Sequence, residues 1–532
     1  MKTLLIPFPR LVFGLASATL AAAILGDSQA HAQPAYGGWT NRYNGPGNYA
    51  DEATAIAVDG SGNVFVTGYS DSGPSSGTLY DYATIKYSNA GVPMWINRYN
   101  GPGSGEDYAR AVAVDTNGNV FVTGYSASSN APYFNYCYAT IGYSSGGVPL
   151  WTNRYKGPFN GDDYARAIAA DASGNVFVTG SSFDFHDSRF NPDYVTIKYS
   201  GAGVPLWTNR YNGPGNGSDE ANAVAADANG NVFVTGISTS TNGYYDYATI
   251  AYSGAGLPLW TNRYNGPGKN IDEARAIAVD ASGNVFVTGA SYGIGPDYAT
   301  IAYSNAGLPL WTNRYNGPGN GDDHARAIAV DGRSNVVVTG GSLGSGSGSD
   351  YATIKYSGAG LPLWTNRYKG AGGYGAEATA IGVDGSGNVF VTGYSGGTDV
   401  AIATLKYSSA GVLLWKNRYA GVSRFDYGNA LAVDNCGNVA VTGKSSNGTD
   451  YDYVTIKYSS AGLPLLTIAR TTTNTLAMSW PSPATDFTLQ QNTSLVTANW
   501  AAVNIVPADN GTNKTVIVDP PEGKRFYRLS HP

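Results

Sequence analysis

The segments ATAIAVDGSGNVFVTGY at residues 53–69, DYATIKYS at 81–88 and PMWINRY at 93–99 recur in this order along the chain. The tryptophan of the third segment marks each copy. These tryptophans are Trp39, Trp95, Trp151, Trp207, Trp260, Trp311, Trp364 and Trp415. Successive tryptophans lie 51 to 56 residues apart. A repeat of about this length that is built from short strands predicts a β-propeller.

Only one part of the repeat varies in length. From the tryptophan to the glycine of the VTG motif there are 29 residues in seven units, as from Trp39 to Gly68, and 28 in the eighth. The segment after this glycine shortens from 14 residues (Gly68 to Tyr82) to nine (Gly289 to Tyr298). Variable loops on a constant scaffold commonly carry function. We therefore expect a fixed framework with one variable loop per unit.

Each unit predicts four strands, which in the first unit cover residues 53–59, 63–69, 81–88 and 93–99. Alternating alanines in the first strand suit the crowded centre of a propeller, whereas the tryptophan of the fourth strand suits the wider outer gap between blades. The turn between the first two strands is typical of a type I turn followed by a left-handed glycine. Ser334 replaces this glycine in the sixth unit and should adopt the same conformation.

The two ends of the repeat array complete each other. The array begins with a lone fourth strand, Trp39 to Tyr43, and its last unit stops after three strands at Tyr458. Pairing these ends would close the ring and remove its open edges. The expected fold is therefore all-β, an eight-bladed propeller closed by the N-terminal strand.

The repeat resembles the bacterial SBBP beta-propeller repeat. Its strand ending in Asp, its Gly-Asn hairpin, the V-x-V-T-G motif and the later glycine before a tryptophan strand all match that pattern, over roughly Trp39 to Gly462. The family is usually described as seven-bladed, so seven blades are the alternative to eight. The resemblance implies an exported or cell-surface protein, mostly without a defined activity, and it brings no catalytic residues.

Both ends of the chain predict further segments. An apolar run from Leu11 to Leu25 and the small-x-small site at residues 30–32 are typical of an export signal. Residues 1–32 are thus expected to be a signal peptide, with an uncleaved anchor as the alternative, and residues 33–464 to form the propeller. Residues 465–532 alternate short strand-like segments with Pro and Asn breaks, which predicts a small β-sandwich similar to an Ig or fibronectin type III module.

Composition restricts the partners. The net charge is −6 and no block of Lys or Arg occurs, so nucleic acid and anionic membrane surfaces are poor partners. After signal cleavage we expect a monomer without a membrane span that is secreted or held at the cell surface. Cys137 and Cys436 lack a metal or redox spacing, and a disulfide between them is not expected.

Acidic residues recur just before the first strand of each unit. In one interpretation they form a ring at one mouth of the central channel that captures cations or basic ligands. In the favoured one they cap turn amides or pair with the arginine of each NRY segment, such as Arg98, while arginines such as Arg110 offset the charge. The acidic residues are Asp51, Glu52, Glu106, Asp107, Asp162, Asp163, Asp219, Glu220, Asp272, Glu273, Asp322, Asp323, Glu377 and Asp426.

The sequence predicts no catalytic, metal or cofactor site. The histidines expected in the mature chain, His186, His324 and His531, lie in different settings, and no Ser-His-Asp order, phosphate loop or HExxH motif occurs. The Asp-x-x-Gly-Asn turn lacks the alternating carboxylates of a calcium loop. Carboxylate pairs recur in most units, which favours a structural role. A non-enzyme is expected, with an extracellular hydrolase or lyase as an alternative.

The variable loops of the first four units are long and aromatic. Strand order places them on the same face as the acidic residues. Exposed rings among Asn, Ser and Asp suit stacking on sugars or protein recognition, and packing of the loops themselves is the alternative. The sequence thus predicts a binding or adhesion scaffold for an extracellular polysaccharide or protein, with a purely structural cell-envelope module as the alternative. The predicted binding residues are Tyr80, Tyr133, Phe134, Tyr136, Phe183, Phe185, Phe190, Tyr244 and Tyr245.

Overall fold

A computed structural model describes most of the chain. The described residues are 38–73, 80–102, 105–128, 135–159, 161–184, 191–346, 348–370, 375–397, 399–423, 425–459, 466–473, 475–481, 488–493, 500–510, 513–519 and 525–530. The predicted signal peptide and the predicted domain boundary at residues 464 and 465 lie outside them. Within the described ranges, no helix has the length and apolar character needed to cross a bilayer.

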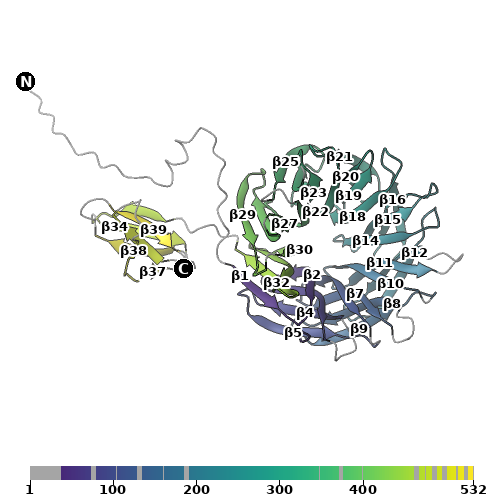
Figure 1. Cartoon of the computed structure of the whole chain (residues 1–532), viewed down its shortest axis with the longest axis horizontal. Helices are drawn as coiled ribbons and strands as arrows, with labels where there is room; N and C mark the ends of the chain where they lie inside the picture. Colours follow the sequence, from purple (N-terminus) through teal and green to yellow (C-terminus); the bar gives the residue numbers. More distant parts are fainter. Residues whose placement is uncertain are drawn as a thin grey trace, which may run out of the picture.

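Eight four-stranded antiparallel sheets form a ring (Figure 1). Blade 1 consists of β2 (Asp51–Val58), β3 (Val64–Asp71), β4 (Tyr80–Tyr87) and β5 (Pro93–Tyr99), hydrogen-bonded in this order. Blades 2 to 7 repeat this order with β6 (Asp107–Val114), β7 (Val120–Ala127), β8 (Tyr136–Tyr143), β9 (Pro149–Tyr155); β10 (Asp163–Ala170), β11 (Val176–Asp184), β12 (Asn191–Tyr199), β13 (Pro205–Tyr211); β14 (Asp219–Ala226), β15 (Val232–Thr239), β16 (Tyr245–Tyr252), β17 (Pro258–Tyr264); β18 (Asp272–Val279), β19 (Val285–Tyr292), β20 (Pro296–Tyr303), β21 (Pro309–Tyr315); β22 (Asp323–Val330), β23 (Val336–Leu343), β24 (Ser349–Tyr356), β25 (Pro362–Tyr368); and β26 (Ala376–Val383), β27 (Val389–Ser395), β28 (Ala401–Tyr407), β29 (Leu413–Tyr419).

Blade 8 is assembled from both ends of the array. It consists of β30 (Asp426–Val433), β31 (Val439–Ser446), β32 (Tyr451–Tyr458) and the N-terminal strand β1 (Trp39–Tyr43). β1 pairs antiparallel with β32, with Trp39 opposite Lys457. An ion pair of 2.8 Å between Arg42 and Asp452 reinforces the junction. The predicted closure by the N-terminal strand is confirmed, and the ring has eight blades and not the seven of the alternative.

The core lies between neighbouring blades. Trp95 of β5 packs against Phe65 of its own blade and Tyr143 of the next, with ring centroids 6.2 and 5.9 Å away. Tyr82 is fully buried and its hydroxyl donates to the carbonyl of Ala139 in the next blade at 3.2 Å. The tryptophan therefore fills the outer gap between blades, as its position in the repeat predicts.

The turn between the first two strands of each blade also follows its prediction. Gly62 has a φ of 77° and Ser334, in the corresponding place of blade 6, has a φ of 60°. One oxygen of Asp59 accepts hydrogen bonds from the amides of Ser61 and Asn63, both at 2.9 Å. The carboxylate is thus committed to its own turn, which supports the structural interpretation of this motif.

The C-terminal residues form two further small sheets. One has the order β33 (Thr467–Arg470), β34 (Leu476–Pro481), β38 (Asn513–Val518), β37 (Ala508–Asp509), and the other the order β36 (Ala501–Ala502), β35 (Thr488–Asn492), β39 (Phe526–Ser530). Met478, Trp480 and Val516 from the first sheet pack with Leu489 from the second in one buried cluster. The C-terminal segment is therefore a small all-β unit with its own core.

Candidate binding site at the mouth of the central channel

A β-bulge interrupts the innermost strand of every blade and takes one residue out of the ladder. In blade 1 the register between β2 and β3 shifts between Ala53 and Ala55, which leaves Thr54 outside the ladder. A bulge re-aims the side chain of the extra residue. The bulged residues of blades 1 to 8 are Thr54, Arg110, Arg166, Asn222, Arg275, Arg326, Thr379 and Asn429.

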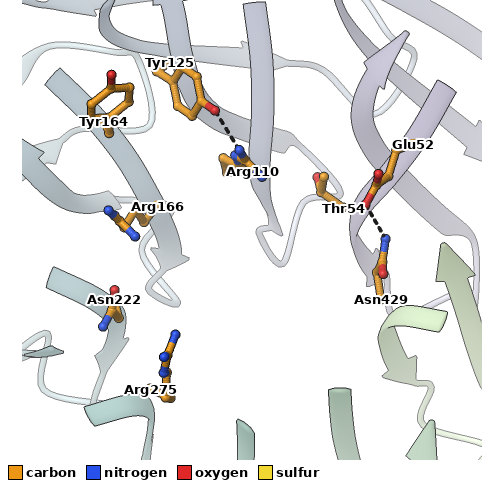
Figure 2. Close-up of a pocket in the computed structure, with 9 residues that line it drawn as sticks. All are labelled: Glu52, Thr54, Arg110, Tyr125, Tyr164, Arg166, Asn222, Arg275 and Asn429. Atoms are coloured by element: carbon orange, nitrogen blue, oxygen red, sulfur yellow. Dashed lines mark hydrogen bonds between the residues drawn. The ribbon is translucent and has the colours of Figure 1, made fainter. Parts of the chain in front are cut away.

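Six of these bulged residues line a single cavity of about 750 Å³. Figure 2 shows their side chains around a shared open space, with Arg110, Arg166 and Arg275 along one side and Glu52 with Asn429 on the other. Tyr125 and Tyr164 complete the lining. The bulges thus gather polar side chains from blades 1 to 5 and blade 8 into one site.

The acidic residues before the first strands lie in two environments: the aspartates at the strand starts cap turns, and several glutamates next to them face the bulged arginines. The aspartates at the start of the first strands are buried, and each accepts a hydrogen bond from a glycine amide of the preceding turn, as Asp51 does from Gly45 at 2.6 Å. Burial raises the pKa of Asp51 and Asp107 to about 6. The capping aspartates are Asp51, Asp107, Asp163, Asp219, Asp272, Asp323 and Asp426. The prediction that these carboxylates cap turn amides is confirmed.

The arginines of the NRY segments pair with a different acid from the one predicted. Arg98 forms an ion pair of 2.9 Å with Asp81, the first residue of its DYATIKYS segment. In blade 2 the equivalent residue is Cys137, and Arg154 donates to its sulfur at 2.7 Å. Burial raises the pKa of the Cys137 thiol. Cys137 and Cys436 are not joined by a disulfide.

Glutamates next to the bulges face the bulged arginines. Arg166 pairs with Glu220 of the next blade at 2.5 Å, and Arg326 pairs with Glu377 at 2.6 Å. Arg275 pairs with Glu273 of its own strand. The predicted charge offset by arginines near the acidic ring is therefore confirmed for three of the four bulged arginines.

Blades 1 to 3 carry a continuous set of aromatic rings, which we call the aromatic arc. Each ring contacts its neighbour with centroids 4.9 to 6.1 Å apart. Its members in order are Tyr80, Tyr69, Tyr108, Tyr125, Tyr136, Tyr164 and Phe183. Two of them, Tyr125 and Tyr164, also line the cavity. The arc therefore leads from the loop ends to the channel mouth.

The predicted binding residues contribute only part of this arc. Tyr80, Tyr136 and Phe183 belong to it, whereas Tyr245, the first residue of β16, and Tyr244 before it do not. Tyr133, Phe134, Phe185 and Phe190 lie outside the described residues. The loops do share a face with the turns before the first strands, since the amide of Gly47 donates to the carbonyl of Asp71 at 3.3 Å.

Sequence reasoning missed Tyr69, Tyr108, Tyr125 and Tyr164 because these residues lie in the repeated strands and not in the loops. For Tyr108 and Tyr164, the sequence did contain a signal. The second residue of the first strand differs from blade to blade, although the residues on either side of it largely repeat. This position holds, from blade 1 to blade 8, Glu52, Tyr108, Tyr164, Glu220, Glu273, His324, Glu377 and Tyr427.

The arc hydroxyls donate to carboxylates. Tyr69 donates to Glu52 at 2.7 Å, and Tyr108 donates to Glu106 at 2.8 Å. Tyr164 donates to Asp162 at 3.1 Å. Burial and the neighbouring carboxylate raise the pKa of Tyr69, Tyr108 and Tyr164 well above that of an ordinary tyrosine. These hydroxyls are consequently neutral near pH 7, which suits them to hydrogen bonding and stacking and makes them poor bases.

Comparison with known proteins agrees with the repeat pattern. Residues 38–74, 98–130 and 259–296 match the SBBP beta-propeller repeat family. Three segments of the repeat array thus match the SBBP pattern. Three of the seven arc rings, Tyr69, Tyr108 and Tyr125, lie within the first two of these matches. No curated protein matches the chain.

Solved propeller structures resemble the chain at low identity. The periplasmic gluconolactonase of Pseudomonas aeruginosa is 13% identical over 71% of this chain and 98% of its own, with a TM-score of 0.41. The beta-propeller domain of the trilobed protease of Pyrococcus furiosus is 7% identical over 67% of this chain and 97% of its own, with a TM-score of 0.38.

Proposed function

We propose that this SBBP-repeat protein is a non-enzymatic binding scaffold, secreted or held at the cell surface, that binds an extracellular polysaccharide at the channel mouth of blades 1 to 3. The observation that carries the proposal is the aromatic arc, seven rings in contact, two of which, Tyr125 and Tyr164, line an open polar cavity. Sugars offer an apolar C–H face for stacking and hydroxyls at their edges for hydrogen bonding, and the site supplies both kinds of partner.

The polar lining favours a sugar over a protein partner. Thr54, Asn222 and Asn429 line the cavity with neutral side chains whose oxygens can accept hydrogen bonds, while their donors bond to backbone carbonyls of the next blade. Tyr125 contributes an aromatic ring. A protein interface would instead be expected to have a fully buried apolar centre. The proposed ligand therefore lies across the mouth and interacts with many polar groups instead of filling an apolar pocket.

Binding is favoured over catalysis by the state of the carboxylates. Glu52 accepts hydrogen bonds from Tyr69, Asn429 and Lys444, the last at 2.8 Å. Glu220 and Glu273 are each paired with an arginine. A general base needs a carboxylate whose proton-accepting oxygen is open to the substrate. We further propose that the C-terminal sheets are an Ig or fibronectin type III-like module that accompanies the binding domain.

A glycan-binding assay with the full chain tests the proposal. Binding should be found for at least one extracellular polysaccharide, and Tyr164→Ala should weaken it by about tenfold or more because an aromatic contact is lost. Tyr244→Ala is the matched control, because Tyr244 is 48% exposed in blade 4 and lies outside the arc. Absence of binding to any polysaccharide, or equal loss in both variants, would contradict the proposal.

A further inference from the structure

We propose that the polysaccharide bound at this mouth is anionic and that Arg110 contacts its acidic group, a carboxylate or a sulfate monoester. This inference rests on the proposed function and specifies its ligand. It arises from the one bulged arginine that is not neutralised. Among the described residues, no carboxylate lies within ion-pair distance of Arg110, whereas Arg166, Arg275 and Arg326 each have such a partner.

Two aromatic side chains contact the Arg110 guanidinium and orient it. Its Nη2 donates to the hydroxyl of Tyr125 at 2.6 Å, and its guanidinium carbon lies 5.2 Å from the Tyr125 ring centroid and 5.7 Å from that of Tyr108. These contacts fix the orientation of the guanidinium and leave the side chain exposed. A planar guanidinium with free donors matches an oxyanion through two parallel hydrogen bonds.

The charge of the cavity lining supports an anion. Three lining residues are cationic, Arg110, Arg166 and Arg275, and the only acidic one is Glu52 on the opposite side of the space (Figure 2). Arg166 and Arg275 retain side-chain exposures of 41% and 40% beside their glutamates. They can therefore donate further hydrogen bonds to a ligand that Arg110 anchors.

The position of Arg110 within the arc favours an anionic sugar over a small free anion. The guanidinium lies over two half-buried arc rings, so a sugar stacked on the arc would place a ring substituent beside it. The chain as a whole has a net charge of −6, so unspecific attraction of a polyanion is disfavoured. A preference for an acidic polymer would therefore arise from this site and not from the charge of the whole chain.

Matched polymers test the inference directly. The full chain is titrated, in about 0.15 M salt to screen unspecific attraction, with polygalacturonate and its fully methyl-esterified form, and with κ-carrageenan and its desulfated form. We expect at least one charged polymer to bind tenfold or more tightly than its neutral counterpart, and the pair that responds identifies carboxylate or sulfate.

Two variants, each of which removes one positive charge, show whether the preference for the charged polymer depends on Arg110. Arg110→Gln should abolish the preference, so that the charged and the neutral polymer bind with similar affinity. Arg333→Gln is the control, since Arg333 lies exposed in the turn between β22 and β23. If charged and neutral polymers bind alike, or if Arg110→Gln keeps the preference, the inference fails while the proposed function stands. If none of the four polymers binds but a neutral glycan of the broader assay does, the inference also fails. If no polysaccharide binds, both fail.

Discussion

Arg110 and Tyr125 form the only contact in the described part of the channel mouth in which a bulged arginine is held by an aromatic hydroxyl instead of a carboxylate. The 2.6 Å hydrogen bond and the 5.2 Å distance from guanidinium carbon to ring centroid join neighbouring positions of one sheet. Because tyrosine brings no negative charge, the contact orients the guanidinium without neutralising it. The site therefore keeps one positive charge beside the aromatic arc.

Tyr125→Phe should separate the orientation of the Arg110 guanidinium by the Tyr125 hydroxyl from the stacking of the ligand on the Tyr125 ring. The ring and its contacts remain, but the hydrogen bond to Arg110 is lost. Affinity for the charged polymer should fall about fivefold, corresponding to roughly 1 kcal/mol, and affinity for the neutral polymer should be unchanged. Isothermal titration calorimetry measures both values. An equal loss for the two polymers would mean that the hydroxyl contacts the sugar itself and not Arg110.

The buried aspartates predict an unusual pH dependence of stability. The pKa values of Asp51, Asp107, Asp163 and Asp219 are raised by burial to about 6, above the ordinary value of 3.8. The native state thus binds protons more tightly than the unfolded chain between these values. The stabilisation is fully present below about pH 4 and is lost as pH rises through 6.

Denaturant unfolding at pH 7.5, 6 and 5 measures this trend, and the free energy of unfolding should rise as the pH falls. The pKa of His324 is lowered by burial, so this one group should lower the free energy of unfolding as the pH falls. The four aspartates outweigh it. Asp107→Asn should make the dependence shallower, since one titrating carboxylate is removed. A free energy of unfolding that is constant or falls from pH 7.5 to pH 5 would contradict the prediction.

The glycine of each capped turn should resist substitution. A Cβ on Gly101 would lie 2.1 Å from Oγ of Ser126 and 2.9 Å from Oδ1 of Asp107. Gly101→Ala should therefore destabilise the protein by about 1 to 3 kcal/mol through overpacking. Gly60→Ala is the control, because nothing lies within 4 Å of a Cβ at that site. Thermal unfolding compares the two, and equal melting temperatures would show that the capped turn adapts.

Cys137→Asp should stabilise blade 2. The substitution places a carboxylate opposite Arg154, as Asp81 lies opposite Arg98 and Asp193 opposite Arg210. A gain of about 0.5 to 2 kcal/mol is expected because the partly buried guanidinium gains a charged acceptor. The reciprocal change, Asp193→Cys in blade 3, should lower stability. Both are read from the midpoint of denaturant unfolding, and a destabilised Cys137→Asp variant would show that this site favours the thiol.

Much of the scaffold could be predicted because the residues that determine its strands and turns lie close together within each repeat. The turn from Asp59 to Asn63 needs only its own side chains and a left-handed residue, so the pattern alone identifies it. Trp39 and Tyr458 mark the incomplete ends of the array, which predicted the closing strand. Tyr80, Tyr136 and Phe183, which were predicted to lie in loops, lie at strand ends and belong to the aromatic arc.

The sequence by itself determined the blades, their number and their closure, since strands, turns and the interblade tryptophan depend on spacing that repeats within one unit. Only the tertiary structure decided which side chains face the channel. The bulges at Thr54 and Arg110 interrupt the alternation of strand faces, so period-two reasoning does not place these residues. The arc likewise joins Tyr69 to Tyr108 and Tyr125 to Tyr164 across blade boundaries, contacts that the ring geometry creates and no single repeat contains.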